Sequence, residues 1–409
     1  MTDKNSLKRR KFIKLSSTAV LAGFTGKFAD VNRNGEMSII QDAARKVGIL
    51  PRRKLGYSGR EVSVLLGAGD MAPPLVAAGV QCGMNYWHKA NRWMNEGVPD
   101  IILKNRDAHY CQVTVDRVGM DHFQGRLDEE EHYRYVREAV KKTGLGYFDD
   151  MQFHYGYHNI EELKKDRSFI RAFERLKKEG LVKHLCISQH SYDGSPRVKN
   201  GQSAAEILTA IVEDGLYEHA QFMYSYGEDP ETDQFMELAR EKHFGTIAMK
   251  TARGIGRMKE NKAFMDKMPE GTSLHNILVR WLTTRTKLDA AVIRVRNMEE
   301  FIETYSGAGK KLSAEEEKVI ALMTTEADTT VCRLCGKCQS GCPQHIPITD
   351  ILRFERYALD DHDWYNASML YSGLPVKGDK CTGCGNCVRN CPIHLHIPEK
   401  LANTHALMS

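Results

Sequence analysis

Cys332-Arg-Leu-Cys335-Gly-Lys-Cys338-Gln-Ser-Gly-Cys342-Pro343 is the stretch that decides the fold of the C-terminal part of the chain. The same spacing returns as Cys381-Thr-Gly-Cys384-Gly-Asn-Cys387-Val-Arg-Asn-Cys391-Pro392, so every cysteine has a counterpart 49 residues later. Gaps of two residues allow one turning loop to present three thiolates to a common centre, while the fourth cysteine points elsewhere. A zinc site of two cysteine pairs has no use for a third cysteine in each run, and the doubled run with both prolines also argues against a disulfide scaffold.

The doubled run is similar to the ligand pattern of bacterial ferredoxins, in which the fourth cysteine of each run binds the other cluster. The resemblance implies two 4Fe-4S clusters and a role in electron transfer. It assigns cluster one to Cys332, Cys335, Cys338 and Cys391, and cluster two to Cys381, Cys384, Cys387 and Cys342. The wide interval between the runs indicates helices between the clusters. We therefore expect a small, mainly α-helical, two-cluster ferredoxin-like domain over residues 331–409.

The middle of the chain predicts a parallel barrel. Short β-rich runs alternate with amphipathic helical segments between Arg60 and Gly307. We expect strands near residues 62–66, 84–87, 111–115, 148–153, 183–187, 220–223, 246–249 and 290–293. Eight parallel strands with helices between them are what a closed (β/α)8 TIM barrel requires. The predicted fold class is therefore α/β, with a barrel over residues 48–310 and a helical linker over 311–330 before the cluster domain.

Residues 1–36 are predicted to be an export signal and a linker. Arg9-Arg10, followed by Phe12-Ile13-Lys14, precedes an apolar run from Leu15 to Phe24 that is too short to span a bilayer. This arrangement resembles a twin-arginine signal; a disordered basic tail is the alternative. The resemblance implies export by the twin-arginine machinery to the periplasm, with the protein folded and its clusters already inserted.

Charge and composition narrow the partners. The 409-residue chain has a formal net charge of +5, but residues 1–30 hold seven Lys/Arg and two Asp, so the remainder carries 51 charges of each sign. Without a basic stripe beyond the leader we expect no nucleic-acid partner, and no segment resembles a membrane span. The expected partners are a redox protein or quinone-linked electron partner and a small-molecule substrate. Cys82, Cys111 and Cys186 lie in or beside predicted strands and are interpreted as small buried apolar residues.

Five segments, in their order along the predicted barrel, carry a second resemblance. They are Leu55–Ser63, Gly83–Trp87, Tyr147–His154, Glu179–Ser188 and Gly245–Lys250. Together they resemble the aldo-keto reductase family, in its branch with a C-terminal ferredoxin-like domain, over roughly residues 53–391. The resemblance implies a barrel that binds a nicotinamide cofactor, with catalytic Asp, Tyr, Lys and His residues at the carboxyl ends of the strands.

The catalytic residues that this resemblance implies are mostly substituted. His88 stands where the family has Asp, Trp93 where it has the proton-donating Tyr, and Asp116 where it has Lys. His154 alone matches. Ketone reduction needs a proton that reaches the oxygen as hydride arrives, and the lysine makes the tyrosine acidic enough to supply it. Because an indole N–H does not ionise usefully, we do not expect NADPH-dependent ketone reduction of the family type.

The residues expected to contact the cofactor also differ in part from those of the family. Ser188 is kept and Gln221 fits a carboxamide contact, but Gln189 stands where the family often has Asn. Arg294-Val295 replaces a Pro-Gly pair, and an exported protein would meet little free NADPH. The sequence therefore argues against NAD(P)H binding, although nicotinamide chemistry with His154 as proton donor stays open as a third possibility.

Another hypothesis concerns a mononuclear metal at the barrel mouth. His88, Asp116 and His154 would lie on neighbouring strand ends, and two histidines with one carboxylate form a ligand set of non-heme iron. The simpler interpretation, which we favour, is that His88 and Asp116 form a polarity-reversed version of the family's Asp–Lys contact, with His154 as a retained polar residue.

Two functions of different classes follow. The first is an exported iron-sulfur oxidoreductase of the aldo-keto reductase family, which moves electrons through the two clusters to or from a site at the barrel mouth. The second is a non-catalytic electron carrier, or a redox-sensing or scaffold protein, with a degenerate barrel. What the barrel mouth binds would separate them.

Overall fold

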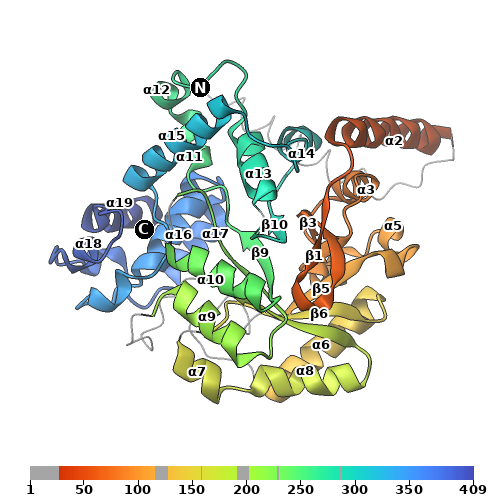
Figure 1. Ribbon diagram of the computed structural model, residues 1–409, viewed down its shortest axis with the longest axis horizontal. Coiled ribbons are helices and arrows are strands. Elements are labelled where there is room, and N and C mark those ends of the chain that lie inside the picture. Colours follow the sequence, from red (N-terminus) through yellow and green to blue (C-terminus); the bar gives the residue numbers. More distant parts are fainter. Residues whose placement is uncertain (1–26, 116–127, 158, 191–201, 228–229, 286) are drawn as a thin grey trace, which may run out of the picture.

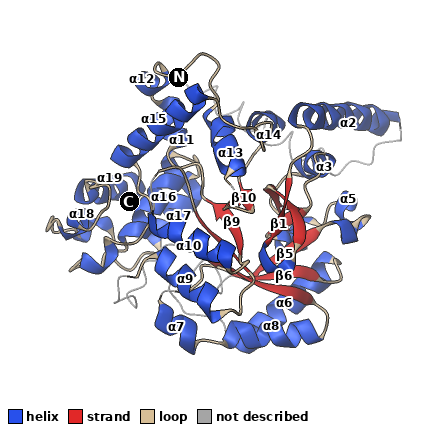
Figure 2. Cartoon of the chain, in the orientation of Figure 1, coloured by secondary structure: helices blue, strands red, loops and turns tan. Residues whose placement is uncertain are grey.

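Helices surround a central set of strands in the computed structural model, which describes residues 27–409 except 116–127, 158, 191–201, 228–229 and 286 (Figures 1 and 2). Eight parallel strands form a closed barrel in which each strand pairs with the next along the chain and the last pairs with the first. The strands are β3 (Leu65–Ala68), β4 (Tyr86–His88), β5 (Tyr110–Val115), β6 (Phe148–Phe153), β7 (Val182–Gln189), β8 (His219–Met223), β9 (Gly245–Met249) and β10 (Ala290–Val292). The predicted barrel is confirmed.

In the described part of the chain, fourteen helices from α2 to α15 lie before the C-terminal cysteine runs. They are α2 (Lys27–Val47), α3 (Pro73–Gln81), α4 (Trp93–Glu96), α5 (Asp100–Leu103), α6 (Glu129–Thr143), α7 (Ile160–Lys165), α8 (Ser168–Lys178), α9 (Ala204–Asp214), α10 (Pro230–Glu241), α11 (Ile255–Glu260), α12 (Lys262–Met265), α13 (Leu274–Thr284), α14 (Met298–Tyr305) and α15 (Ala314–Thr330). Capping boxes begin α6, α9 and α15, so the first backbone N–H groups of these helices are satisfied. No helix among the described residues combines the length and the apolar character that crossing a membrane requires.

One large apolar core joins the barrel to these helices. It runs from Ile40 in α2 to Ala327 in α15. Strand β6 is buried along its whole length, as expected of a barrel strand with side chains on one face inside and helices over the other. The leader's arginine pair lies outside the described residues.

The first predicted strand, residues 62–66, is wrong in its extent. Instead, β1 (Arg52–Leu55) and β2 (Arg60–Ser63) form an antiparallel hairpin, and the barrel strand β3 begins at Leu65. Gly56 and Gly59 turn the chain with positive φ angles of 44° and 60°, which glycine adopts without steric cost. Leu55 and Val62 pack against apolar residues inside the barrel, so the hairpin closes its amino end. The turn was not predicted because the apolar run through Val62 continues into β3 in the sequence.

Residues after α15 form a second helical domain with its own core, from Cys332 to Met408. Its helices are α16 (Ile348–Leu359), α17 (Trp364–Ser372), α18 (Asn386–Arg389) and α19 (Ile397–Met408). Short 3-10 turns also occur, three in the barrel part of the chain and two in this domain: η1 (Gly56–Ser58), η2 (Ala90–Arg92), η3 (Arg106–Ala108), η4 (Gln339–Gly341) and η5 (Gly378–Lys380). Helices do separate the two cysteine runs, as the wide interval predicts. In Figure 1 this domain, coloured blue, lies against one side of the barrel.

The 49-residue repeat of the cysteines is also a structural repeat. Helix α19 begins and ends 49 residues after α16. The residues with left-handed backbone in the first run recur at the same offset in the second: Leu334, Gly336 and His345, then Gly383, Gly385 and His394. The two cysteine loops therefore follow the same course.

Candidate functional site

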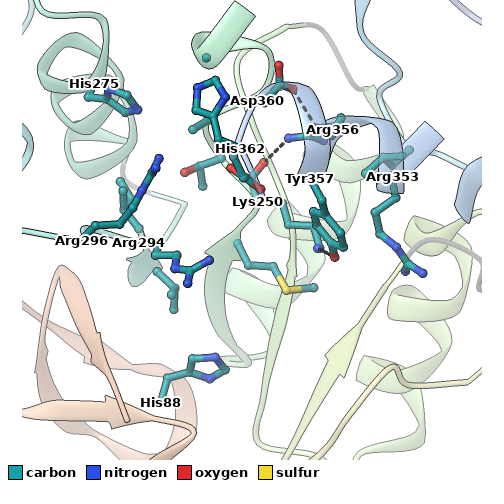
Figure 3. A pocket seen from close by; sticks show the side chains of 18 of the residues that line it. His88, Lys250, His275, Arg294, Arg296, Arg353, Arg356, Tyr357, Asp360 and His362 are labelled. Carbon is teal, nitrogen blue, oxygen red and sulfur yellow. Dashed lines mark hydrogen bonds and ion pairs between the residues drawn. The ribbon is translucent and has the colours of Figure 1, made fainter. Parts of the chain in front are cut away.

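A cavity of about 600 Å³ lies at the carboxyl ends of the barrel strands, between the barrel and the C-terminal domain (Figure 3). Barrel residues such as His88, His154 and Lys250 form one side, and Arg353 and Tyr357 of the C-terminal domain belong to the other. Enzymes built on this barrel place their active sites at the same end. We refer to this space as the mouth cavity.

Four of the seven barrel residues singled out from the sequence line the mouth cavity: His88, His154, Ser188 and Gln221. Ser188 and Gln221 lie on neighbouring strands beside Met249, whose Sδ is 3.9 Å from Ser188 Oγ and 3.6 Å from Gln221 Nε2. Asp116 lies outside the described residues. The structure therefore brings together two residues of the proposed cofactor contact and two of the proposed catalytic set.

The other two residues, Trp93 and Gln189, do not line the mouth cavity. Trp93 is 2% exposed and packs against Trp87, with ring centroids 6.1 Å apart. The side-chain amide of Gln189 accepts a hydrogen bond from the backbone N–H of Tyr157 at 3.0 Å and donates one to its carbonyl at 2.9 Å. The geometry gives both residues contacts of the kind that hold the fold together.

His88 is held in one neutral tautomer. Its Nδ1 lies 2.9 Å from Gln112 Oε1, while Gln112 Nε2 donates to Tyr86 OH at 3.0 Å. Because an amide oxygen only accepts, this network places the proton on Nδ1. Burial, with the charge of Lys89 acting in the same direction, lowers the pKa of His88 to about 3. At neutral pH His88 therefore has an unprotonated Nε2.

His190, which the sequence analysis did not single out, also lines the cavity. Its ring centroid lies 5.3 Å from that of His154 and 4.6 Å from that of Tyr155. The residue is 6% exposed, and neither ring nitrogen has a hydrogen-bond partner among the described residues. Burial, together with the charge of Lys250, lowers the pKa of His190 far below its ordinary value. Its place directly after β7, at a strand's carboxyl end, was the available signal.

Helix α16 forms the wall that the C-terminal domain contributes. Residues at helical spacing line the cavity: Arg353, Arg356, Tyr357 and Asp360. Arg356 donates to the carbonyl of Lys250 at 3.3 Å, and Arg257 of α11 pairs with Asp360 at 2.7 Å. A Cβ atom at Gly256 would lie 2.3 Å from the Asp360 carbonyl oxygen, so the two domains approach as closely as glycine allows.

The eight cysteines of the two runs gather into two groups. Four of them line one small hollow: Cys342, Cys381, Cys384 and Cys387. In the other group, burial and the charges of Cys335 and Cys391 raise the pKa of Cys332 to about 12. Burial and the charges of the same group raise the pKa of Cys338 as well. The fourth cysteine of each run thus lies with the first three of the other run, as the crossed assignment requires.

The two cysteine groups differ in depth. Cys332, Cys338 and Cys391 are buried, whereas Cys384 is exposed. Leu334, between the first two cysteines of the first run, lines the mouth cavity. Arg253, which follows β9, is 2% exposed and donates to the carbonyl of Val331 at 2.7 Å. The first group is therefore the one that the barrel holds.

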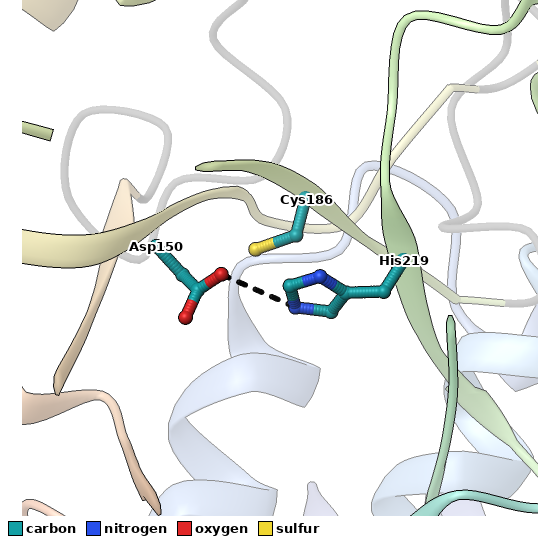
Figure 4. Close-up of side chains that lie close together, drawn as sticks. All are labelled: Asp150, Cys186 and His219. Carbon is teal, nitrogen blue, oxygen red and sulfur yellow. Dashed lines mark ion pairs between the residues drawn. The ribbon is translucent and has the colours of Figure 1, made fainter. Parts of the chain in front are cut away.

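Besides the cysteine groups, three potential metal ligands lie close together at the amino end of the barrel: Asp150, Cys186 and His219 (Figure 4). Arg60 of the hairpin donates to both carboxylate oxygens of Asp150 at 2.7 Å, so this carboxylate is already neutralised. Burial raises the pKa of Cys186 well above its ordinary value, which keeps the thiol protonated. A cation would have to displace a buried guanidinium, and we interpret the group as structural. Cys82, Cys111 and Cys186 are all buried, as predicted.

Comparison with known proteins identifies the C-terminal domain. Residues 324–392 match the family model of the 4Fe-4S dicluster domain. The C-terminal region resembles a 4Fe-4S dicluster domain. This dicluster domain and the closed barrel together confirm the predicted fold class, a (β/α)8 barrel followed by a small, mainly helical ferredoxin-like domain.

No curated protein matches the chain. Among solved structures it is similar to an aldo-keto reductase from Pseudomonas aeruginosa, at 14% identity and a TM-score of 0.48, over 64% of this chain and 97% of that one. It is also similar to the holo form of an aldo-keto reductase from Bacillus halodurans, at 14% identity and a TM-score of 0.49, over 67% of this chain and 96% of that one.

Proposed function

We propose that the protein is an exported iron-sulfur oxidoreductase, in which two 4Fe-4S clusters pass single electrons between an external redox partner and a small molecule in the mouth cavity. Cluster one would be held by Cys332, Cys335, Cys338 and Cys391, and cluster two by Cys381, Cys384, Cys387 and Cys342. The thiolates of both groups suit iron, and each cluster supplies one-electron chemistry when it is bound.

The position of Leu334 carries this proposal. It belongs to the loop that presents three ligands of cluster one, and its own side chain lines the mouth cavity. The same loop that holds the cluster therefore contacts whatever the cavity binds. Because the barrel anchors this loop through Arg253, we expect the spacing between cluster and substrate to be constant.

The difference in depth between the cysteine groups suggests which cluster would face the external partner and which would face the cavity. Cys384 is exposed, so cluster two would face the external partner, a redox protein or a quinone-linked one. Cluster one would pass electrons between cluster two and the cavity. The crossed cysteines, Cys342 and Cys391, tie the two ligand groups into one unit.

The mouth cavity favours an enzyme over a carrier with a degenerate barrel. Five of the eight strands place residues in it, and the dicluster domain completes its wall. Hydride transfer from NADPH with a family-type proton donor has no support, because Trp93 packs in the core. The mononuclear metal of His88, Asp116 and His154 stays a prediction.

Metal analysis and spectroscopy test the cluster assignment. Protein purified anaerobically should hold about eight irons and eight acid-labile sulfides per chain. After reduction, Cys342→Ser should give the same electron paramagnetic resonance spectrum as Cys384→Ser, and Cys391→Ser the same spectrum as Cys332→Ser. Cys82→Ser is the control that should keep both signals. Pairing of Cys342→Ser with Cys332→Ser would instead mean that each run holds its own cluster.

A second experiment tests what the barrel does. Stoichiometric NADP in protein from its native host would favour nicotinamide chemistry with His154 as the proton donor. A cavity that binds no small molecule under any redox condition would favour the electron carrier.

Export has its own test. Replacing both Arg9 and Arg10 with lysine should keep the protein in the cytoplasm, whereas Lys4→Arg should not. Continued export of the double variant would refute the twin-arginine interpretation.

A further inference from the structure

Lys250 and Tyr357 meet inside the mouth cavity although they come from different domains. Lys250 directly follows β9 and has a left-handed backbone, with φ of 53°. Tyr357 lies on α16 of the dicluster domain, and Lys250 Nζ donates a hydrogen bond to its hydroxyl oxygen. The ammonium also lies 4.5 Å from the centroid of the tyrosine ring. Figure 3 shows Tyr357 and Arg353 side by side on α16, with His88 across the cavity.

The charges around Tyr357 favour its phenolate. Burial alone would raise the pKa of Tyr357, but the charges of Lys250 and Arg353 and the hydrogen bond from Lys250 outweigh it and lower this pKa. The charge of Asp361 acts in the opposite direction. Burial lowers the pKa of Lys250, and the charges of Arg353 and Arg356 add to this effect. Lys250 therefore stabilises the ionised form of Tyr357.

We propose that Tyr357 is the proton donor of the mouth cavity, that Lys250 makes it acidic, and that the substrate is a small organic anion. This inference rests on the proposed function, because the electrons that create a need for protons come from the clusters. The family's catalytic Tyr and Lys are replaced in this sequence by Trp93 and Asp116. Tyr357 and Lys250 would supply a tyrosine–lysine pair from other positions. The pair forms only when the dicluster domain covers the barrel.

The step balances one proton against each electron. Cluster one, when bound, would supply the electron to a substrate oxygen; the O–H bond of Tyr357 would then break as a new O–H bond forms on the substrate. The electron pair of the broken bond stays on the phenolate oxygen, where the ammonium of Lys250 stabilises it. Water from the solvent side returns a proton to Tyr357, so the charge of the cavity is unchanged and a second electron can follow.

The lining of the cavity has more basic than acidic residues, although Arg296, Arg353 and Arg356 are each paired with a carboxylate. It contains seven Lys/Arg residues, namely Lys89, Lys250, Lys259, Arg294, Arg296, Arg353 and Arg356, against four acidic ones, namely Glu260, Glu300, Asp360 and Asp361. Burial lowers the pKa values of His88, His190 and His275, so these histidines stay neutral. The positive charge of the lining therefore comes from its Lys and Arg residues. Such a focused positive field raises the local concentration of anions.

A spectrophotometric titration of tyrosine ionisation at 295 nm tests the donor. In oxidised holoprotein, about one of the sixteen tyrosines should ionise below the ordinary value near 10. This early step should be missing in Tyr357→Phe and should move to higher pH in Lys250→Met. Tyr365→Phe, which removes a tyrosine that is 78% exposed in the same domain, should keep it. Superimposable curves for the unmodified protein and Tyr357→Phe would overturn the assignment.

The same titration tests the substrate class. Succinate in the cavity should move the early step to higher pH by several tenths of a unit, because its charge opposes the phenolate. Succinamide has the same shape without charge and should leave the curve unchanged. Equal effects of both compounds, or no effect of either, would overturn the anionic substrate. Because iron content and cluster spectra are measured separately, failure of the clusters and failure of this pair give different results.

Discussion

Both ends of the barrel bury ionisable side chains, but the hydrogen-bond partners of these side chains differ. At the amino end, Asp150 is fully buried and both of its carboxylate oxygens accept hydrogen bonds from Arg60. At the carboxyl end, His190 is almost as buried, yet neither ring nitrogen has a partner among the described residues. Lys250 and Tyr357 line the same cavity and are joined by a hydrogen bond.

The difference shows what separates a structural group from a candidate site. Asp150, Cys186 and His219 are close enough to hold a metal, but Arg60 already satisfies the carboxylate. The carboxyl end instead has an open cavity, which His190 lines with two ring nitrogens that have no partner among the described residues. In the described part of the chain the amino end also has buried polar atoms without a partner, Arg60 Nε and His219 Nδ1, so the carboxyl end differs by the open cavity next to His190. Buried polar groups of this kind call for an explanation.

The largest expected effect belongs to the amino end. Arg60→Met would leave the buried carboxylate of Asp150 without its partner, and breaking such a pair costs about 3–5 kcal/mol in the free energy of unfolding. Thermal unfolding of the anaerobic holoprotein measures the loss. Iron content should not change, because the dicluster domain lies at the other end of the barrel.

The matched control is an ion pair at the surface. Lys262 and Asp266 are 3.1 Å apart, with side chains 87% and 64% exposed. Solvent screens this pair, so Lys262→Ala should change stability by less than about 0.5 kcal/mol. A loss in Arg60→Met no larger than this would mean that the amino end does not depend on its buried pair.

Sequence patterns were sufficient for most of the fold. Seven of the eight barrel strands occur near their predicted residues because apolar runs and turn residues mark them directly. The hairpin of β1 and β2 escaped prediction, because the apolar run through Val62 continues into the barrel strand and only the backbone of Gly56 and Gly59 reveals the turn. The cysteine groups were predictable because the spacing of the cysteines along the sequence is what allows them to bind a cluster.

The mouth cavity was predictable only in part. His88, His154, Ser188 and Gln221 were found because they stand at strand ends that the family resemblance marks. Tyr357 was not found, since its role depends on how α16 packs against the barrel, and no local pattern encodes a contact between residues 107 positions apart. Trp93 was placed at the mouth by alignment with a family tyrosine, but its bulk turns it into the core.

A smaller effect is expected where the two domains meet. In Gly256→Ala the new methyl group would meet the backbone of Asp360, which cannot move aside as a flexible side chain would. Overpacking of this kind costs about 1–3 kcal/mol. The variant should push α16 away from the barrel, raise hydrogen exchange in α16 and separate Tyr357 from Lys250, while the iron content stays the same.

Gly373→Ala is the control for this substitution within the dicluster domain. The nearest atom to its new Cβ would be the Leu370 carbonyl oxygen at 3.7 Å, an ordinary contact. Hydrogen exchange of α16 should then match the unmodified protein. Equal behaviour of the two alanine variants would show that the domains do not depend on this close approach.

The smallest effect, and the sharpest contrast with Arg60, is expected for His190→Phe. At pH 7 the loss of two ring nitrogens that have no partner among the described residues should leave stability unchanged or raise it by about 1 kcal/mol, because an unsatisfied buried polar group is costly. The pKa of His190 is lowered in the folded protein, so below pH 6.5 the unfolded chain takes up a proton there that the folded protein does not. Stability therefore falls with decreasing pH, by about 1.4 kcal/mol per pH unit for each such histidine. Unfolding followed from pH 7 to pH 5 should show this slope reduced by that amount in His190→Phe. An unchanged slope would mean that the imidazole is protonated or paired in the folded protein, and the contrast between the two ends of the barrel would then disappear.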